Sequence, residues 1–260
     1  MVDRIKSYII NLKIRPDKYG KVMKELEKIN LAPERFEAVY TKELEKSYIN
    51  SIVHPSLDYT VKYGRTTDSE FASYSAIGCT LSHVALWKKL VESTEHDRFL
   101  IFEDDVLVKT DKQEMDNYVN ELDKVDWDVA YLGYIDSLGL RPSKCESVDG
   151  SLCKAMKIIY GTHAYIINKK GAEKLLERVF PIVDQVDSYM SQMMLKGLNV
   201  YRPIRSYLIQ TPFDTDIQSL DFKPLFNRYG PYTFFVIVLI CILLYYLLKR
   251  CNKCDDCYVN

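Results

Sequence analysis

Three consecutive carboxylates, Glu103, Asp104 and Asp105, follow an apolar run in the stretch FLIFEDDVLV, residues 99–108. A short apolar run of this length is typical of a buried strand, and carboxylates are seldom buried without a partner. Hard divalent cations such as Mn²⁺ and Mg²⁺ bind carboxylate oxygens and phosphate oxygens alike. The stretch therefore predicts a metal-bridged diphosphate site, although an acidic pair can also cap a helix.

A basic segment follows the first apolar run, SYIINL at residues 7–12. Its members are Lys13, Arg15, Lys18 and Lys21. A helix that begins at Pro16 would add the positive end of its dipole, which favours an anion. A basic first turn can equally be a solvated surface. Together with the acidic strand end, the segment predicts a nucleotide diphosphate site.

The elements that must position these residues alternate between apolar runs and helical patterns. We expect strands at 7–12, 36–40, 99–103 and 128–133, a strand pair at 154–160 and 162–168 broken at Gly161, and helices at 15–29, 76–92, 115–125 and 169–180. Residues 41–74 show no clear period and predict a long connection. The alternation predicts an α/β sandwich with a largely parallel sheet, whose ligands gather at the carboxyl ends of the strands.

The overall charge argues against a nucleic-acid partner. The 260 residues carry a formal net charge of -1, and acids and bases are interleaved along the chain. No block of Lys or Arg is long enough to follow a phosphate backbone.

The end of the chain changes composition sharply. Residues from Tyr232 to Leu248 carry no charge, and at helical rise they cover roughly 25 Å, which is enough for a thin bilayer. A buried core helix is the alternative, but such helices rarely lack a polar face. We therefore predict a division into a domain at 1–225, a linker at 226–231, a transmembrane helix at 232–250 and a cysteine-containing tail at 251–260.

The charged N-terminus lacks the pattern of a signal peptide, so we expect a single-pass, tail-anchored membrane protein whose domain lies in the cytosol. Basic residues on both sides of the span leave the orientation open. Three cysteines before the span do not form a disulfide framework. The three tail cysteines, Cys251, Cys254 and Cys257, favour acylation over zinc because a fourth ligand is missing.

Several ordered blocks together resemble glycosyltransferase family 25. These blocks are YIINLKIRPDK, IGCTLSHVALWKKLVE, FLIFEDDVLV, WDVAYLG, GTHAYIINKKGAEKLL, PIVDQVD and IQTPFDTDIQS, and they extend from about Ser7 to Ser219. The resemblance implies a Rossmann-related GT-A fold, a UDP-sugar donor carrying galactose or glucose, and Mn²⁺ or Mg²⁺ at the acidic motif. The acceptor would be a glycan, a lipid or a protein.

The resemblance also implies roles for individual residues. Asp105 and Glu103 would bind the metal, with Glu103 or Asp104 contacting the ribose or a metal-bound water. The implied donor-binding residues in the other blocks are Asn11, Leu12, Arg15, Gly78, Ser82, His83, Gly161 and His163. The spacing of His83 with Thr80, Trp87 and Leu90 on one helix face also fits a core role. Cys79 fits a packed residue better than a nucleophile, because no charged neighbour would lower its pKa.

An inverting transfer would need a general base for the acceptor hydroxyl. Asp184 and Asp187 lie three apart at a predicted helix start, where they would share a face, and Asp214 and Asp216 lie in PFDTDIQ. The first pair could equally cap the helix. We favour Asp187, with Asp184 and Asp216 as the other candidates.

Three functions fit these observations. A membrane-anchored, metal-dependent glycosyltransferase is favoured. An inactive relative that serves as a membrane-bound binding or adhesion module is the second, and the intact acids argue against it. A hydrolase of nucleotide sugars is the third, because it would use the same metal and diphosphate.

Overall fold

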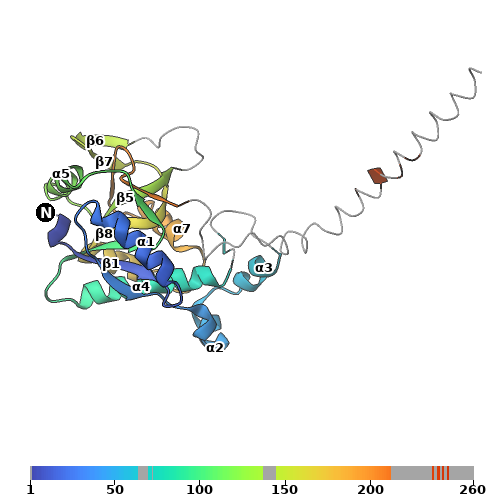
Figure 1. Ribbon diagram of the computed structural model, residues 1–260. Helices are drawn as coiled ribbons and strands as arrows, with labels where there is room; N and C mark the ends of the chain where they lie inside the picture. Colours follow the sequence, from blue (N-terminus) through green and yellow to red (C-terminus); the bar gives the residue numbers. More distant parts are fainter. Residues whose placement is uncertain are drawn as a thin grey trace, which may run out of the picture.

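The computed structural model describes residues 2–63, 70, 71, 73–136 and 145–211, together with Val236, Leu239, Ile240, Ile242 and Tyr245. These residues form a three-layer sandwich in which helices cover both faces of a central sheet (Figure 1). The α/β architecture predicted from the alternating elements is confirmed.

The central sheet has eight strands in the order β2-β1-β3-β8-β5-β9-β7-β6. Their bounds are β1 Lys6–Asn11, β2 Glu34–Glu37, β3 Arg98–Glu103, β5 Val129–Asp136, β6 Cys145–Asp149, β7 Leu152–Ala155, β8 Ile159–Asn168 and β9 Val200–Pro203. β1 pairs in parallel with β2 and β3, and β5 pairs in parallel with β9. β8 runs antiparallel to both β3 and β5, and β7 runs antiparallel to β9. The sheet is therefore mixed, with its main strands in one direction and β8 reversed at its centre.

The predicted strand pair around Gly161 is wrong in one respect, because Gly161 lies inside β8. Its φ of +94° is open to glycine at little cost, so the chain bends there without ending the strand. The antiparallel register sets Phe102 against Ala164. As a result, the first residues of β8 reach the carboxyl end of β3, where the acidic residues lie.

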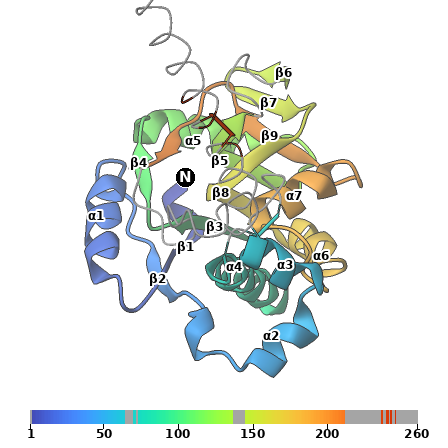
Figure 2. The ribbon, with the colours of Figure 1, turned by 90° about the vertical axis from the view of Figure 1, so that its right-hand side faces the viewer.

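Different helices cover the two faces of the sheet (Figures 1 and 2). α1 (Pro16–Glu27) and α5 (Lys112–Leu122) pack on the first face, and α4 (Ser75–Glu92), α6 (Lys169–Leu176) and α7 (Val186–Met194) on the second. α1 begins at Pro16 as predicted, since proline suits the first helical position.

The side chains of β3 alternate between the two cores. Leu100 and Phe102 pack with α1 and α5, whereas Phe99 and Ile101 pack with α4, α6 and α7. Each of these four is at most 1% exposed. Burial of such a side chain stabilises the fold by roughly 1.5–3 kcal/mol, so β3 is firmly held up to its acidic end.

The connection predicted at 41–74 contains helices, contrary to the sequence-based expectation. A short 3-10 helix at Thr41–Glu43 is followed by α2 (Lys46–Ile52) and α3 (Ser56–Tyr63). Ile49, Leu57 and Phe71 pack against Ile77 of α4 in a small separate core. Helices of one or two turns present too few apolar positions for a period to be recognised.

The predictions for the end of the chain lie largely outside the described residues. These include Asp214 and Asp216, the linker at 226–231, most of the span at 232–250 and the tail at 251–260. Among the described residues, no helix has both the length and the apolar character that crossing a bilayer requires.

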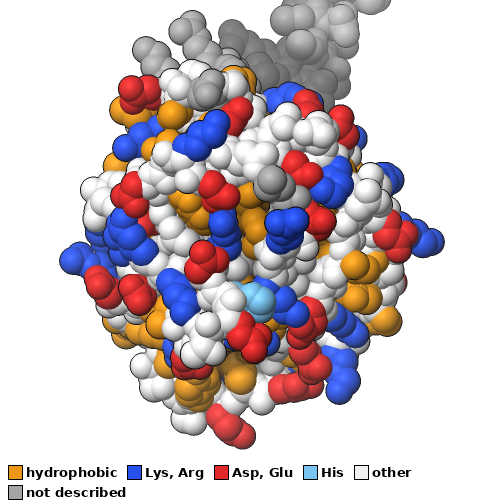
Figure 3. Space-filling view, turned by 90° about the vertical axis from the view of Figure 1, so that its left-hand side faces the viewer, with side chains coloured by type: hydrophobic (Ala, Val, Ile, Leu, Met, Phe, Trp, Pro, Cys, Tyr) orange, Lys and Arg blue, Asp and Glu red, His pale blue; other side chains and the backbone are white. Residues whose placement is uncertain are grey.

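The described surface carries acids and bases in close mixture. On the face drawn in Figure 3, Lys and Arg side chains alternate with Asp and Glu. This face shows no field of one sign that would attract a phosphate backbone.

Candidate functional site

A cavity of about 300 Å³ opens at the carboxyl ends of β1 and β3. Volumes of this order accommodate small ligands. Four parts of the chain line it: the β1–α1 connection, the segment after β2, the first turns of α4, and the residues Glu103, Asp104 and Asp105 at the carboxyl end of β3. We call these three residues the acidic turn. The lining residues are Ile10, Leu12, Ile14, Lys18, Ala38, Val39, Tyr40, Thr41, Lys42, Ser75, Gly78, Cys79, Ser82, Glu103, Asp104 and Asp105. Leu12, Gly78, Ser82 and all three acids were predicted from the sequence.

Gly78 and Ser82 fasten one wall of the cavity. A Cβ atom at Gly78 would lie 2.4 Å from the carbonyl oxygen of Val39, so only glycine allows α4 to approach this segment. The Ser82 hydroxyl accepts a hydrogen bond from the Val39 amide at 2.9 Å and donates one to the Gly78 carbonyl at 2.7 Å. Both residues therefore shape the cavity through the backbone that they hold.

The acidic turn is held by a second, two-stranded sheet. β4 (Val106–Val108) follows Asp105 directly and pairs with β10 (Leu208–Gln210). The Thr211 amide donates to the Asp105 carbonyl oxygen at 2.7 Å, and the Gln210 side chain donates to Asp105 Oδ2 at 3.3 Å. Asp105 Oδ1 is buried and has no hydrogen-bond partner among the described residues.

The environment of Asp105 suits a cation. Burial, followed by the negative charges of Glu103 and Asp104, raises the pKa of Asp105 to about 8. A buried carboxylate oxygen without a donor, beside two further carboxylates, is an unfavourable arrangement unless a positive charge is supplied. The residues therefore fit a hard divalent cation at Asp105 and Glu103.

Asp104 connects the acidic turn to the basic segment. Its carboxylate accepts a hydrogen bond from Asn11 Nδ2 at 2.6 Å and lies 3.9 Å from Lys18 Nζ. Lys18 is only 2% exposed and lines the cavity. Arg15 instead forms an ion pair with Asp17 at 3.0 Å, and neither Arg15 nor Asn11 lines the cavity.

Glu103 is held by a chain of hydrogen bonds from the core. Thr162 Oγ1 donates to Glu103 at 2.5 Å, and His83 Nε2 lies 3.3 Å from the same oxygen. Burial raises the pKa of Glu103, but the hydrogen bonds from His83 and Thr162 outweigh this effect and hold the pKa below its ordinary value. These bonds therefore favour the ionised form of Glu103.

The donor-to-acceptor direction of these hydrogen bonds follows from the residue at their buried end, Trp87. Trp87 Nε1 donates to the Tyr165 hydroxyl at 2.9 Å, and that hydroxyl lies 2.9 Å from His83 Nδ1. Because indole nitrogen can only donate, the Tyr165 proton is free to point at His83 Nδ1. The network then assigns the His83 proton to Nε2, from which it is donated to Glu103.

The two carboxylates of PIVDQVD have different surroundings. α7 begins at Val186, so Asp184 precedes the helix, and the predicted shared helix face is wrong. Asp184 accepts a hydrogen bond from Gln192 Nε2 at 2.6 Å. Asp187 accepts bonds from the backbone amides of Ser188 and Gly161, yet burial raises its pKa. A carboxylate with a raised pKa is suited to general-base catalysis.

His163 lies behind the two-stranded sheet. It is 1% exposed, and its Nε2 lies 3.1 Å from the Leu208 carbonyl oxygen of β10. A Cβ atom at Gly133 would lie 2.2 Å from this ring, so glycine there makes room for it. Burial lowers the pKa of His163 and favours the neutral ring. His163 does not line the cavity; it holds β10 beside the acidic turn.

Sequence reasoning missed three residues that contact the site. Thr162 and Tyr165 reach Glu103 and His83 only because β8 is antiparallel to β3. Gln210 reaches Asp105 only because β10 pairs with β4. Strand direction and pairing leave no local signal in a single sequence, so these contacts could not be predicted.

A family model and individual proteins of known sequence both match this chain, and they agree on one family. The model of glycosyltransferase family 25 (LPS biosynthesis protein) matches residues 4–190. Procollagen galactosyltransferase 2 of Homo sapiens is 27% identical over 172 residues, covering 65% of this chain and 27% of that protein. Procollagen galactosyltransferase 1 of Danio rerio is 27% identical over 223 residues, covering 84% of this chain and 35% of that protein.

Relatives without activity are also similar. The inactive glycosyltransferase 25 family member 3 of Mus musculus is 25% identical over 226 residues, covering 84% of this chain and 36% of that protein. The chain thus spans about a third of the length of such relatives. Among solved structures, the crystal structure of A197 from STIV has a TM-score of 0.39 and 14% identity, covering 78% of this chain and 83% of that one. This likeness is too low to support an argument.

Proposed function

Because the chain belongs to glycosyltransferase family 25, we propose that it transfers a hexose, galactose or glucose, from a UDP-sugar to a hydroxyl group of a glycan, lipid or protein acceptor. The observation that carries the proposal is the cavity at the acidic turn. It combines the partnerless Asp105 Oδ1 with the buried cation of Lys18. These are the charges that a metal-bound diphosphate requires.

Asp105 and Glu103 would hold Mn²⁺ or Mg²⁺, and Lys18 would face the diphosphate. When bound, the metal neutralises charge on the departing nucleotide. The Trp87–Tyr165–His83 chain keeps Glu103 ionised and fixes its orientation. The wall held by Gly78 and Ser82 limits the space available to the donor.

We propose that Asp187 accepts the proton of the acceptor hydroxyl in an inverting transfer. Its interaction with Glu103 contributes to its raised pKa, which places the two carboxylates within electrostatic reach of each other. Asp184 is engaged by Gln192 and is not needed for this role.

The first experiment mixes the full chain with Mn²⁺ and a panel of UDP-sugars and records thermal unfolding together with UDP release. One UDP-sugar should raise the unfolding temperature only when Mn²⁺ is present, because a ligand that binds the folded state stabilises it by mass action. Asp105→Asn should remove this shift, whereas Asp126→Asn, an exposed carboxylate far from the cavity, should leave it unchanged.

The inactive relatives give the alternative outcome a definite meaning. If no UDP-sugar stabilises the protein, the chain is a binding module that keeps the fold. If UDP and free sugar appear without transfer to any acceptor, the protein is a hydrolase of nucleotide sugars.

We further propose that residues 232–250 anchor the protein in a membrane. The described residues in this stretch, Val236, Leu239, Ile240, Ile242 and Tyr245, are helical and 47–61% exposed. Cys153 is disulfide-bonded, and one such bond does not contradict the prediction that the cysteines before the span form no disulfide framework. Disulfides persist in oxidising compartments, so this bond favours a domain outside the cytosol over the expected cytosolic one. Protease protection of intact membrane vesicles tests the orientation.

A further inference from the structure

A sulfur, a nitrogen and an oxygen ligand meet at the wall of the cavity. Cys79, His83 and Glu103 each present one ligand atom, and these atoms lie within 4.8 Å of one another. Within the part of the chain that the structure describes, no other three His, Cys, Asp or Glu residues meet in this way. Cys79 and His83 lie one turn apart on α4, and Glu103 ends β3. We propose that these three residues bind a thiophilic divalent cation, Zn²⁺.

The geometry suits tetrahedral coordination. Two ligand atoms bound to zinc at about 2.0–2.1 Å and a tetrahedral angle are separated by about 3.3 Å. His83 Nε2 and the Glu103 carboxylate oxygen are 3.3 Å apart, so their spacing needs no change. Three protein ligands leave a fourth position open toward the cavity, which Cys79 and Glu103 line.

The donor set selects the metal. Thiolate and imidazole ligands favour zinc, whereas Mn²⁺ and Mg²⁺ prefer oxygen ligands. This site is therefore chemically different from the one proposed at Asp105, although Glu103 belongs to both. The nearby carboxylate of Asp104 adds a negative charge that attracts a cation into the cavity.

Neighbouring side chains already hold two of the three ligands, His83 and Glu103, in position. The other ring nitrogen of His83 faces the Tyr165 hydroxyl at 2.9 Å, and Thr162 holds Glu103 at 2.5 Å. Such contacts orient metal ligands. On binding, Cys79 releases its thiol proton to solvent. The His83 proton moves from Nε2, where it faced Glu103, to Nδ1, where it faces the Tyr165 oxygen, so that Nε2 is free for the metal.

Zinc in this position occupies Glu103 and part of the donor cavity. It would therefore inhibit sugar transfer, and this consequence rests on the proposed function. Zinc binding itself does not, so the two are tested by different measurements.

The test uses Co²⁺ as a spectroscopic substitute for zinc in the full chain, with Cys251, Cys254 and Cys257 changed to serine to remove the tail thiols. We expect a near-ultraviolet thiolate-to-cobalt absorption band that Zn²⁺ displaces at one equivalent. Cys79→Ser should abolish the band, and His83→Gln should weaken Co²⁺ binding by at least about tenfold. Thermal unfolding without metal checks that both variants fold.

Asp105→Asn is the matched control, because it removes the proposed Mn²⁺ ligand and should leave the cobalt band unchanged. A band that survives Cys79→Ser, or no band in the parent, would overturn the zinc site whatever the UDP-release assay shows. Conversely, a cobalt band in a protein that uses no UDP-sugar would retain the zinc site and reject only the transferase.

Discussion

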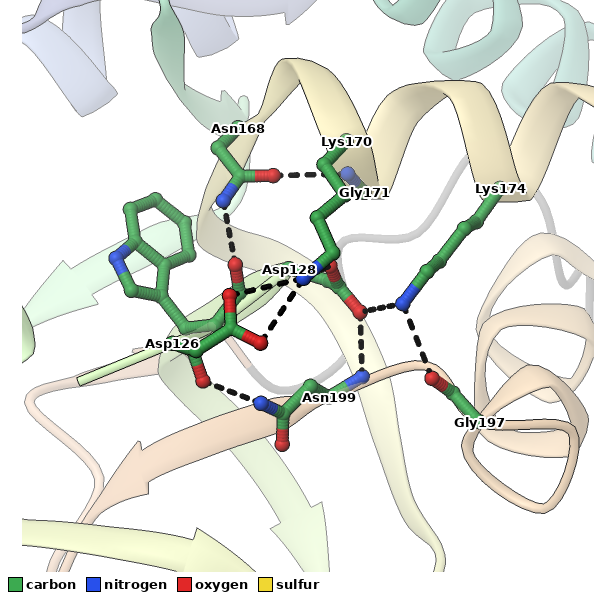
Figure 4. A network of polar contacts seen from close by, with 9 residues as sticks. Asp126, Asp128, Asn168, Lys170, Gly171, Lys174, Gly197 and Asn199 are labelled. Carbon is green, nitrogen blue, oxygen red and sulfur yellow. Dashed lines mark hydrogen bonds and ion pairs between the residues drawn. The ribbon is translucent and has the colours of Figure 1, made fainter.

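Two aspartates at opposite edges of the central sheet, Asp128 and Asp105, have contrasting surroundings. Asp128 precedes β5 at the amino edge and is fully buried, with donors to its Oδ2 and a lysine beside its Oδ1, which accepts no hydrogen bond among the described residues (Figure 4). Lys174 Nζ lies 2.5 Å and the Asn199 amide 2.7 Å from its Oδ2, and Lys170 Nζ lies 3.7 Å from its Oδ1. Asp105 follows β3 at the carboxyl edge, and among the described residues a single side-chain donor contacts it, Gln210 at 3.3 Å.

The difference indicates that the amino edge of the sheet contributes to stability, whereas the carboxyl edge is arranged for function. At the amino edge, Asp128 joins α6, β5 and the start of β9, and its charge is matched within the protein. At the carboxyl edge, three carboxylates and Asp187 are brought together without enough positive charge, which costs stability in the metal-free protein. Substitutions at the two edges should therefore have opposite effects on folding and on activity.

Asp187→Asn should produce the largest effect. The amide cannot accept the acceptor proton, so transfer should fall by about 10²–10⁴-fold while Mn²⁺-dependent donor binding stays intact. Radiolabelled sugar transfer and donor-induced thermal shifts measure the two separately. Asp184→Asn is the matched control and should retain activity within a few fold. Equal losses in both variants would remove Asp187 from the role of base.

Asp128→Ala tests the amino edge. It removes the partner of Lys174 and leaves the buried Asn199 amide without an acceptor, so the free energy of unfolding should fall by about 3 kcal/mol. Denaturant titration measures this loss. Asp126→Ala removes an exposed ion pair with Lys170 and should cost less than about 1 kcal/mol. Similar losses for the two variants would show that the buried network contributes no more to the free energy of unfolding than an exposed ion pair does.

Asp105→Asn should stabilise the metal-free protein at alkaline pH. The folded-state pKa of about 8 lies above the ordinary 3.8, so the contribution of this carboxyl group to stability is complete below about pH 4 and is lost progressively as the pH rises to about 8. We expect the wild type in chelator to lose roughly 5 °C in unfolding temperature over this range relative to the variant. Parallel pH profiles of the two proteins would contradict the raised pKa.

Tyr165→Phe should give the smallest effect. The variant removes the hydroxyl that faces His83 and Trp87, so the His83 ring is no longer held in one tautomer. Transfer should fall less than about tenfold, with a pH dependence that changes shape, since the bond to Glu103 weakens. Tyr131→Phe, which alters a neighbouring buried tyrosine, serves as the control. An unchanged pH profile in Tyr165→Phe would exclude the positioning role.

The sequence was sufficient where a property is local. The apolar run at 99–102 predicted β3, and Pro16 marked the start of α1, because burial and backbone preference act over a few residues. The acids of the turn and the glycine at Gly78 were likewise found in the sequence, and both line the cavity.

The sequence was insufficient where a contact depends on pairing. The role of Thr162 depends on the direction of β8, and the role of Gln210 depends on the pairing of β10 with β4. The same limit explains why the sequence favoured Asp187 but could not distinguish its surroundings from those of Asp184. Their difference is set by where α7 begins and by which groups approach from β8.

The contacts between β10 and the acidic turn also affect how the protein folds during translation. Gln210 and Asp105 are separated by 105 positions, and both bonds to Asp105 come from Gln210 and Thr211. During translation, β3 and the acidic turn leave the ribosome long before the strand that restrains them. Such a long-range contact forms late because a large loop must close first. The cavity is therefore completed only when residues near 211 emerge, so nascent chains stalled earlier would lack the contacts that hold Asp105 in place.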